Sequence, residues 1–253
     1  MNGVIKEITI PGRNGYDIAA QSNVQDEHKS ILLCLRGFGG GRRSPVVEAL
    51  TEALDADGIG VVTFPWPGHG DSPAEGSDLT VENCLSDLDA VLEYIRETWP
   101  QPVSCFATSY GGYLAALYRC EHPAAFEKLV LRSPALCMPQ TFIGFFPEKE
   151  KERFLAGEPM SIGISERPME LTVRFYDSLK AHDAFHAPVP SPERVLILQG
   201  DRDYVVLPED TAAYAEKNGL PVVWFRGSDH SYRNPGDTEK IVAETRSFLL
   251  GGD

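Results

Sequence analysis

Two hydrophobic patterns alternate along most of this chain. Short, nearly continuous apolar runs are typical of strands that are buried on both faces of a parallel sheet. These runs lie at 31–35, 59–64, 102–106, 128–132, 195–199 and 222–225. Between them the apolar residues recur at helical spacing, most clearly over 80–99. The alternation predicts an α/β fold, a mostly parallel central sheet with helices on both faces.

The remaining elements follow from weaker patterns. Two short strands are expected at 4–10 and 16–21, joined by the turn-rich sequence PGRNG. Further helices are expected at 45–56, 110–122, 209–217 and 238–249.

One region interrupts this alternation. Residues 137–192 contain several phenylalanines and prolines and the charge run EKEKER, and they are too many for a simple connection. We expect a helical cap inserted over the carboxyl edge of the sheet, where ligands of α/β proteins bind. The core would then comprise 1–136 and 193–253. A surface excursion with its own small hydrophobic cluster is the alternative.

Charge and composition exclude some partners. The 253 residues carry a net charge of −14, which argues against nucleic acid and against anionic membranes. No signal peptide and no spanning segment is apparent. The five cysteines are odd in number and scattered, with no C-x-x-C and no metal-ligand spacing. These features favour the cytoplasm, and a homodimer remains open.

A serine at a strand-to-helix junction is the first candidate for chemistry. Ser109 stands within ATSYG at 107–111, after a predicted strand and before a predicted helix. This is the form of a nucleophile elbow, with Ala107 in place of the first glycine. Such a tight turn exposes the serine hydroxyl and excludes bulky side chains two residues to either side.

Serine needs a base, and the base needs an orienting carboxylate. Of the six histidines, His230 alone lies in a loop after a late core strand, 222–225. The strand 195–199 leads into Asp201 and Asp203, and spacing does not separate these two. The chain order nucleophile, acid, histidine is that of the α/β-hydrolase fold.

An oxyanion requires two donors. The backbone N–H of Tyr110, next to the serine, is one candidate. The other is the N–H of Phe38, in the glycine-rich loop RGFGGG at 36–41. That loop lacks the lysine and the spacing of a P-loop.

Together these motifs resemble the α/β-hydrolase superfamily over nearly the whole chain. The resemblance rests on RGFGG, GHGDS at 68–72, ATSYG, and the trailing G-x-x-D and Asp229-His230. It is closest to capped serine carboxylesterases of the monoacylglycerol-lipase and cinnamoyl-esterase kinds. It selects Asp203 as the acid and gives His69 a structural role. Arg36 departs from the histidine common there, so it either alters the loop or places a cation near the site.

The resemblance implies a serine hydrolase that cleaves carboxylic esters through an acyl-enzyme on Ser109, without a cofactor or metal. Four residues are candidates for binding the small-molecule substrate: Arg36, Phe142, Phe145 and Phe146. The phenylalanines favour aryl or short to medium acyl esters, unless they form the core of the cap itself. Thioesterase, peptidase and C–C bond hydrolase activities use the same residues. A hydrolase-like protein that senses a ligand is a further alternative.

Overall fold

The sheet organises the fold. The computed structural model describes residues 5–40, 44–163 and 168–251. Within them, eight strands form one sheet in the order β1-β2-β4-β3-β5-β6-β9-β10. The strands are β1 (Lys6–Ile10), β2 (Ile18–Ser22), β3 (Ser30–Leu35), β4 (Ile59–Phe64), β5 (Val103–Thr108), β6 (Leu129–Arg132), β9 (Val195–Gly200) and β10 (Val222–Phe225). β1 and β2 are antiparallel to their neighbours, and the pairs from β4 to β10 are parallel.

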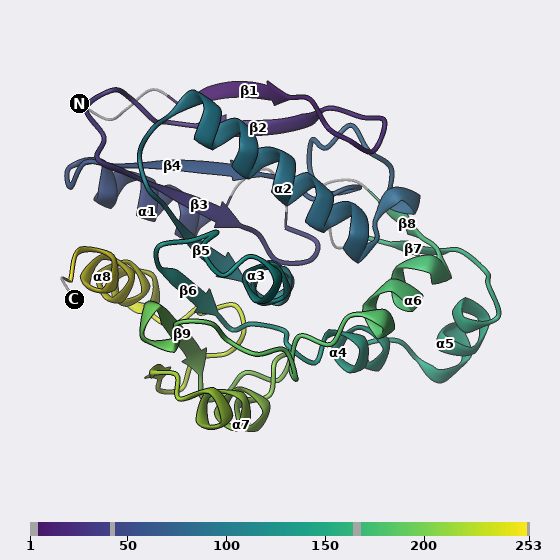
Figure 1. Ribbon diagram of the computed structural model, residues 1–253. Helices are drawn as coiled ribbons and strands as arrows, with labels where there is room; N and C mark the ends of the chain where they lie inside the picture. Colours follow the sequence, from purple (N-terminus) through teal and green to yellow (C-terminus); the bar gives the residue numbers. More distant parts are fainter. Residues whose placement is uncertain (1–4, 41–43, 164–167, 252–253) are drawn as a thin grey trace.

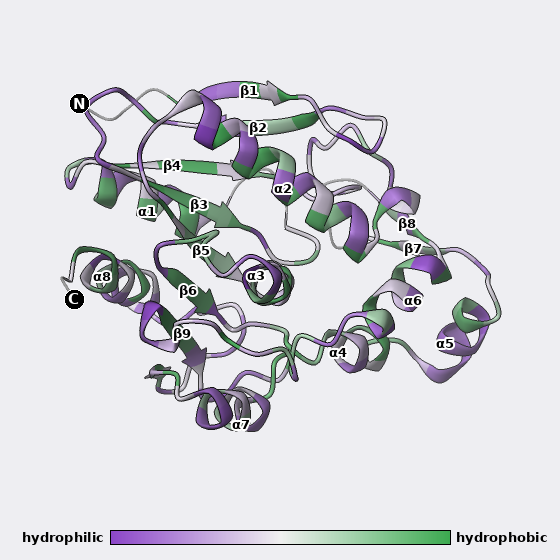
Figure 2. Cartoon of the chain, in the orientation of Figure 1, coloured by the Kyte–Doolittle hydropathy of each residue, from purple (hydrophilic) through white to green (hydrophobic). Residues whose placement is uncertain are grey.

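Alternate residues of the central strands pack in two separate cores. In β3, Ile31, Leu33 and Leu35 join one buried cluster, whereas Leu32 and Cys34 join the other. A strand that buries both faces reads as a continuous apolar run. Figure 2 shows this, since the central strands are coloured as hydrophobic.

Helices cover both faces of the sheet (Figure 1). On one face α1 (Pro45–Asp55) packs against α8 (Asp237–Leu250). The helices α2 (Val81–Thr98), α3 (Tyr110–Glu121) and α7 (Pro208–Asn218) contribute to the core on the other face. The predicted α/β fold with a mostly parallel sheet is therefore confirmed. The expected core elements occur within a few residues of their predicted limits, and predicted positions 4 and 41 lie outside the described residues.

The segment between β6 and β9 contains more than helices. It holds α4 (Met138–Gly144), α5 (Glu148–Leu155) and α6 (Val173–Ala181), which group at one end of the molecule in Figure 1. Between α5 and α6, β7 (Met160–Ile162) and β8 (Met169–Leu171) form a two-stranded antiparallel sheet that the sequence did not predict. β8 contacts the short 3₁₀ helix η1 (Gly76–Asp78) of the core, so the segment is anchored there as well as at its two ends. A second 3₁₀ helix, η2 (Pro192–Arg194), leads into β9.

Two further findings concern the described residues alone. All five cysteines are free thiols, with Cys34, Cys84 and Cys105 buried. No helix there has both the length and the apolar character needed to cross a bilayer.

Candidate active site

Ser109 occupies a strained turn between β5 and α3. Its backbone has φ 52° and ψ −114°, a conformation that L-residues rarely adopt. The turn is held by the N–H of Ser109, which donates to the carbonyl of Arg132 at 3.0 Å, and by the N–H of Ala135, which donates to the carbonyl of Ser109. The constraint presents the hydroxyl at the carboxyl edge of the sheet.

Close packing around this turn explains two of the glycines. A Cβ on Gly111 would lie 2.6 Å from the carbonyl oxygen of Arg36 and 2.8 Å from that of Leu35. Both are backbone atoms, so no side chain fits. A Cβ on Gly37 would lie 3.2 Å from the Cβ of Ser109. The loop after β3 therefore passes directly beside the serine.

Ser109, His230 and Asp203 form a chain of hydrogen bonds, although they come from three different loops. His230 Nε2 lies 3.1 Å from Ser109 Oγ, and His230 Nδ1 lies 2.8 Å from Asp203 Oδ2. The Asp203 side chain is fully buried and that of His230 is 20% exposed. An ionised carboxylate only accepts hydrogen bonds, so Nδ1 carries the hydrogen and Nε2 is left to accept from the serine hydroxyl.

The environment of Asp203 favours its ionised form. Burial raises the pKa of Asp203, but the hydrogen bond from His230 and those from the N–H groups of Val205 and Val206 more than offset this. The net result is a pKa below the ordinary value. The two N–H groups donate to Oδ1 at 2.9 and 2.8 Å, which leaves Oδ2 facing the imidazole.

Asp201, the alternative acid, has a different role in this structure. Its Oδ1 accepts a hydrogen bond from the N–H of Gly227, at the start of the loop that carries His230. A Cβ on Gly200 would lie 2.4 Å from the carbonyl oxygen of Ser228, so these loops pack without a gap. Asp201 thus ties the histidine loop to the end of β9.

The two candidate oxyanion donors are backbone N–H groups: Phe38 lines the same cavity as Ser109, and Tyr110 follows Ser109 in the chain. The N–H of Tyr110 belongs to the first turn of α3, where N–H groups have no acceptor within the helix. The N–H of Phe38 donates no hydrogen bond to another described residue. Both groups are thus available to a ligand atom.

A cavity of about 350 Å³ opens beside Ser109 and His230. Its walls come from the loop after β3, the start of α1, the ends of β5 and β6, the histidine loop and α8. Arg132 and Tyr232 also line it. No acidic residue lines the cavity within the described part of the chain.

Comparison with known proteins identifies the family. Residues 26–162, more than half of the chain, match the model of the family described as serine aminopeptidase, S33. The chain belongs to this family of α/β hydrolases. A search of curated proteins gave no match.

Solved structures share the fold of this hydrolase. Est1E from Butyrivibrio proteoclasticus, with ferulic acid bound, has a TM-score of 0.80 at 20% identity, over 96% of this chain and 98% of that one. A putative hydrolase from Agrobacterium vitis S4 has a TM-score of 0.80 at 22% identity, over 97% and 98%. The Paleococcus ferrophilus monoacylglycerol lipase has a TM-score of 0.71 at 22% identity, over 92% and 98%.

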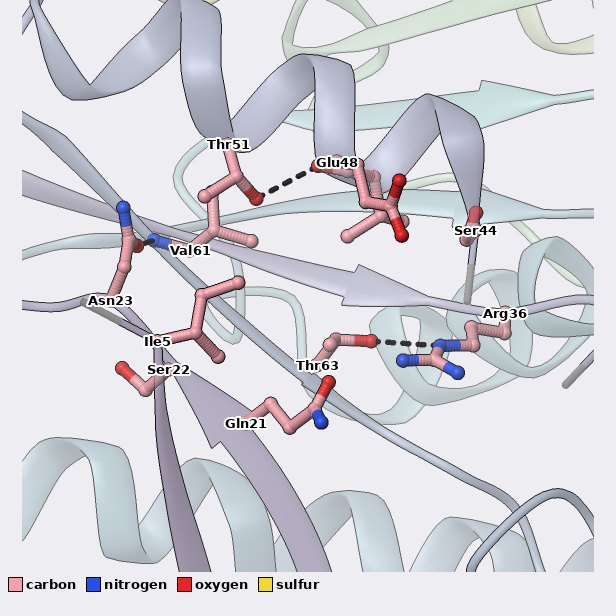
Figure 3. Close-up of a pocket in the computed structure, with 11 residues that line it drawn as sticks. Ile5, Gln21, Ser22, Asn23, Arg36, Ser44, Glu48, Thr51, Val61 and Thr63 are labelled. Carbon is pink, nitrogen blue, oxygen red and sulfur yellow. Dashed lines mark hydrogen bonds between the residues drawn. The ribbon is translucent and has the colours of Figure 1, made fainter. Parts of the chain in front are cut away.

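Arg36 of this hydrolase lies between two cavities. It lines the one beside Ser109 and a second of about 480 Å³ between α1 and the strands β2 and β4. Figure 3 shows its guanidinium directed at Thr63, to which Nε donates at 3.2 Å. Its carbonyl oxygen accepts from the indole N–H of Trp66. Arg36 therefore helps to fix the loop after β3.

The three candidate phenylalanines of the hydrolase lie in different environments. Phe142 is 2% exposed and its ring contacts those of Phe38 and Phe175. Phe146 is partly buried and contacts Phe142, whereas Phe145 is 56% exposed. None of the three lines the cavity beside Ser109. Phe142 packs the segment 137–192 onto the loop that carries Phe38, and Phe146 packs within the segment, against Phe142 and Phe154.

Sequence reasoning missed Arg132 and Tyr232. Arg132 reads as the last residue of an apolar run, and Tyr232 as a loop residue. The available signal was the position of Arg132: a charged residue that ends a buried strand at the ligand-binding edge of an α/β sheet.

Within the described residues of the hydrolase, no group of three or more metal-ligating side chains is arranged to hold an ion.

Proposed function

We propose that this protein is a serine hydrolase that cleaves carboxylic esters through an acyl-enzyme on Ser109. The observation that carries the proposal is the hydrogen-bonded chain from Ser109 through His230 to Asp203, beside an open cavity. Membership of a hydrolase family supports it independently.

The proposed reaction needs only these side chains and two backbone N–H groups. Ser109 Oγ attacks the ester carbonyl carbon while its proton passes to His230 Nε2, and Asp203 stabilises the imidazolium. The N–H groups of Phe38 and Tyr110 bind the oxyanion. Collapse expels the alcohol, which takes the proton from His230. Water, deprotonated by His230, then attacks the acyl-enzyme, and the carboxylic acid and free Ser109 result.

The segment 137–192 also has a role in the proposed scheme. We propose that it is a cap over a core of residues 1–136 and 193–253. Phe142 packs against Phe38, so the cap supports the loop that supplies an oxyanion donor. We also propose that the enzyme is cytoplasmic, because its five free thiols fit a reducing compartment.

The lining of the cavity favours esters over amino-terminal peptides. An aminopeptidase has to bind a free ammonium group, and a carboxylate is the strong partner for that charge. The described lining residues include two arginines, Arg36 and Arg132, and no acid. The cavity, about 350 Å³, also limits the group that enters it to a small one. The acyl preference is proposed to be aryl or short to medium chain.

Steady-state hydrolysis of 4-nitrophenyl esters of increasing acyl length, with an aryl ester beside them, tests the proposal. Ser109→Ala is the matched control, since it removes one buried oxygen and keeps the fold. We expect turnover to fall by at least about 10³-fold in that variant, with an unchanged melting temperature. Turnover that persists in Ser109→Ala would refute the proposal. The absence of turnover in both proteins, with a ligand-dependent rise in melting temperature, would favour a sensing protein.

A further inference from the structure

We propose that Arg132 binds a carboxylate carried by the leaving group of the substrate. The inference rests on the proposed ester hydrolysis and adds to it the chemical class of the alcohol. It starts from a buried cation that the hydrogen-bonded chain does not use.

Arg132 ends β6 immediately beside the nucleophile. It is the register partner of Thr108 in β5, and its carbonyl holds the N–H of Ser109. Arg132 is among the residues that line the cavity beside Ser109 and His230. An anion bound there would therefore lie next to the reacting atoms.

The guanidinium is buried, and no carboxylate of the described residues forms an ion pair with it, although the charges of Asp203, Asp229 and Asp237 act on it from farther away. Arg132 is 9% exposed, and its Nε is a buried donor with no hydrogen-bond partner in the described chain. Its Nη2 makes one long contact, 3.5 Å, to the carbonyl of His230, and its guanidinium stacks on the ring of Tyr232 at 4.2 Å. Arginine keeps its charge even where burial lowers its pKa, as it does here.

The nearby carboxylates are already engaged. Asp203 accepts from His230 and from two backbone N–H groups. Asp229 pairs with Arg233, and Asp237 accepts from Ser228 and from the N–H of Asn234. A buried charge without an ion-pair partner is costly, and a ligand carboxylate would supply that partner. A planar guanidinium matches a planar carboxylate in both charge and shape.

The position of His230 places the anion on the leaving-group side. His230 Nε2 has to deliver its proton to the departing oxygen, so the alcohol half of the ester lies against this residue. The cavity is lined by His230 and by the two residues after it, Ser231 and Tyr232. Arg36 lines the same cavity, with its Nε held by Thr63.

Two acetate esters that differ in one charge test the proposal. 4-Acetoxybenzoate and methyl 4-acetoxybenzoate form the same acetyl-enzyme and release phenols that differ in a carboxylate. We expect the ratio of their kcat/KM values to fall by about 10- to 100-fold from wild type to Arg132→Met, the size of one charge-assisted hydrogen bond. Arg226→Met is the matched control: Arg226 is exposed, lies on the loop that leads to His230 and does not line the cavity. It should leave the ratio unchanged.

The outcomes separate the possible roles of Arg132. If kcat/KM falls equally for the two esters in Arg132→Met, Arg132 has a structural role in packing against Tyr232, and the proposal is overturned. A shift confined to the pair mono(4-nitrophenyl) adipate and 4-nitrophenyl hexanoate would place the anion on the acyl side and also overturn it. No Ser109-dependent hydrolysis of any ester is a different result, and it refutes the proposed function itself.

A measurement on the wild-type protein tests the proposal even if Arg132→Met does not fold. 4-Hydroxybenzoate should inhibit the hydrolysis of 4-nitrophenyl esters competitively, at least about tenfold more strongly than 4-hydroxybenzamide. Equal inhibition by the two would overturn the proposal.

Discussion

Replacing Asp203 with asparagine changes one atom of the site and is expected to invert the direction of one hydrogen bond. The carboxylate Oδ1 accepts from two backbone N–H groups, those of Val205 and Val206. The oxygen of an asparagine has to stay there, because the alternative places an amide NH₂ against two fixed donors. The NH₂ group then occupies the position of Oδ2 and faces His230 Nδ1 and Gln199 Nε2.

The imidazole has to respond to this new donor. Its Nδ1 becomes the acceptor, and the hydrogen moves to Nε2, where it points at Ser109 Oγ. A protonated Nε2 cannot take the proton of the serine, so the base is lost while the geometry is kept. The wrong tautomer costs about 10⁴-fold in kcat in a comparable triad, equivalent to about 5 kcal/mol.

The assay is kcat for a short-chain 4-nitrophenyl ester, measured beside the melting temperature. We expect kcat to fall by about 10³- to 10⁴-fold in Asp203→Asn, with a folded protein. Asp201→Asn is the matched control, since Asp201 holds the neighbouring loop through Gly227 and does not contact His230. A kcat within tenfold of wild type in Asp203→Asn would refute the tautomer argument, and an equal loss in both variants would locate the effect in the loop.

Two further predictions concern stability. Asp87 of α2 accepts hydrogen bonds from Asn14 and Tyr16, and burial raises its pKa to about 6 from an ordinary value of 3.8. The folded state therefore loses about 3 kcal/mol of stability as pH rises from about 4 to above 6. Asp87→Asn should remove this slope, measured by urea denaturation at pH 4 and pH 7. A steeper loss in the variant would contradict this sign. Phe142→Ala should lower the free energy of unfolding by about 3–5 kcal/mol, because Phe142 packs within a cluster of aromatic rings. The matched change at its exposed neighbour, Phe145→Ala, should cost less than about 0.5 kcal/mol. Similar melting temperatures for the two variants would argue against the packing role of Phe142.

The strands and helices of the core could be predicted from the sequence because they all meet the same physical requirement, burial of apolar side chains. Strands covered on both faces have to be apolar throughout, and the helices between them have to be apolar on one side. The strands β7 and β8 escaped the pattern, since three residues are too few for a period to show. Tertiary packing holds these strands in place. Met169 of β8 lies against the backbone of Gly76, so closely that a Cβ on Gly76 would lie 2.6 Å from Met169 Cγ.

The candidate site was predictable to a different degree. Ser109 and His230 could be chosen because each follows a recognisable strand, but spacing left Asp201 and Asp203 equal. Three-dimensional contacts distinguish the two aspartates, since only Asp203 reaches His230 and Asp201 holds Gly227. Phe142, Phe145 and Phe146 looked alike in sequence, but Phe142 lies within α4 and is buried, whereas Phe145 follows the last residue of α4 and is exposed. The position of Arg132 at the end of a buried strand was the one signal in the sequence, because an Nε without a hydrogen-bond partner is visible only once its surroundings are known.

Trapping the acyl group on the protein would test the proposed mechanism. Wild-type protein is mixed with excess 4-nitrophenyl butyrate, quenched in acid within the first turnovers, digested and analysed by mass spectrometry. We expect the butyryl mass on the peptide that contains Ser109, and no such mass in Ser109→Ala. Release of 4-nitrophenol without an adduct at Ser109, or with the adduct on another residue, would contradict the covalent role of this serine.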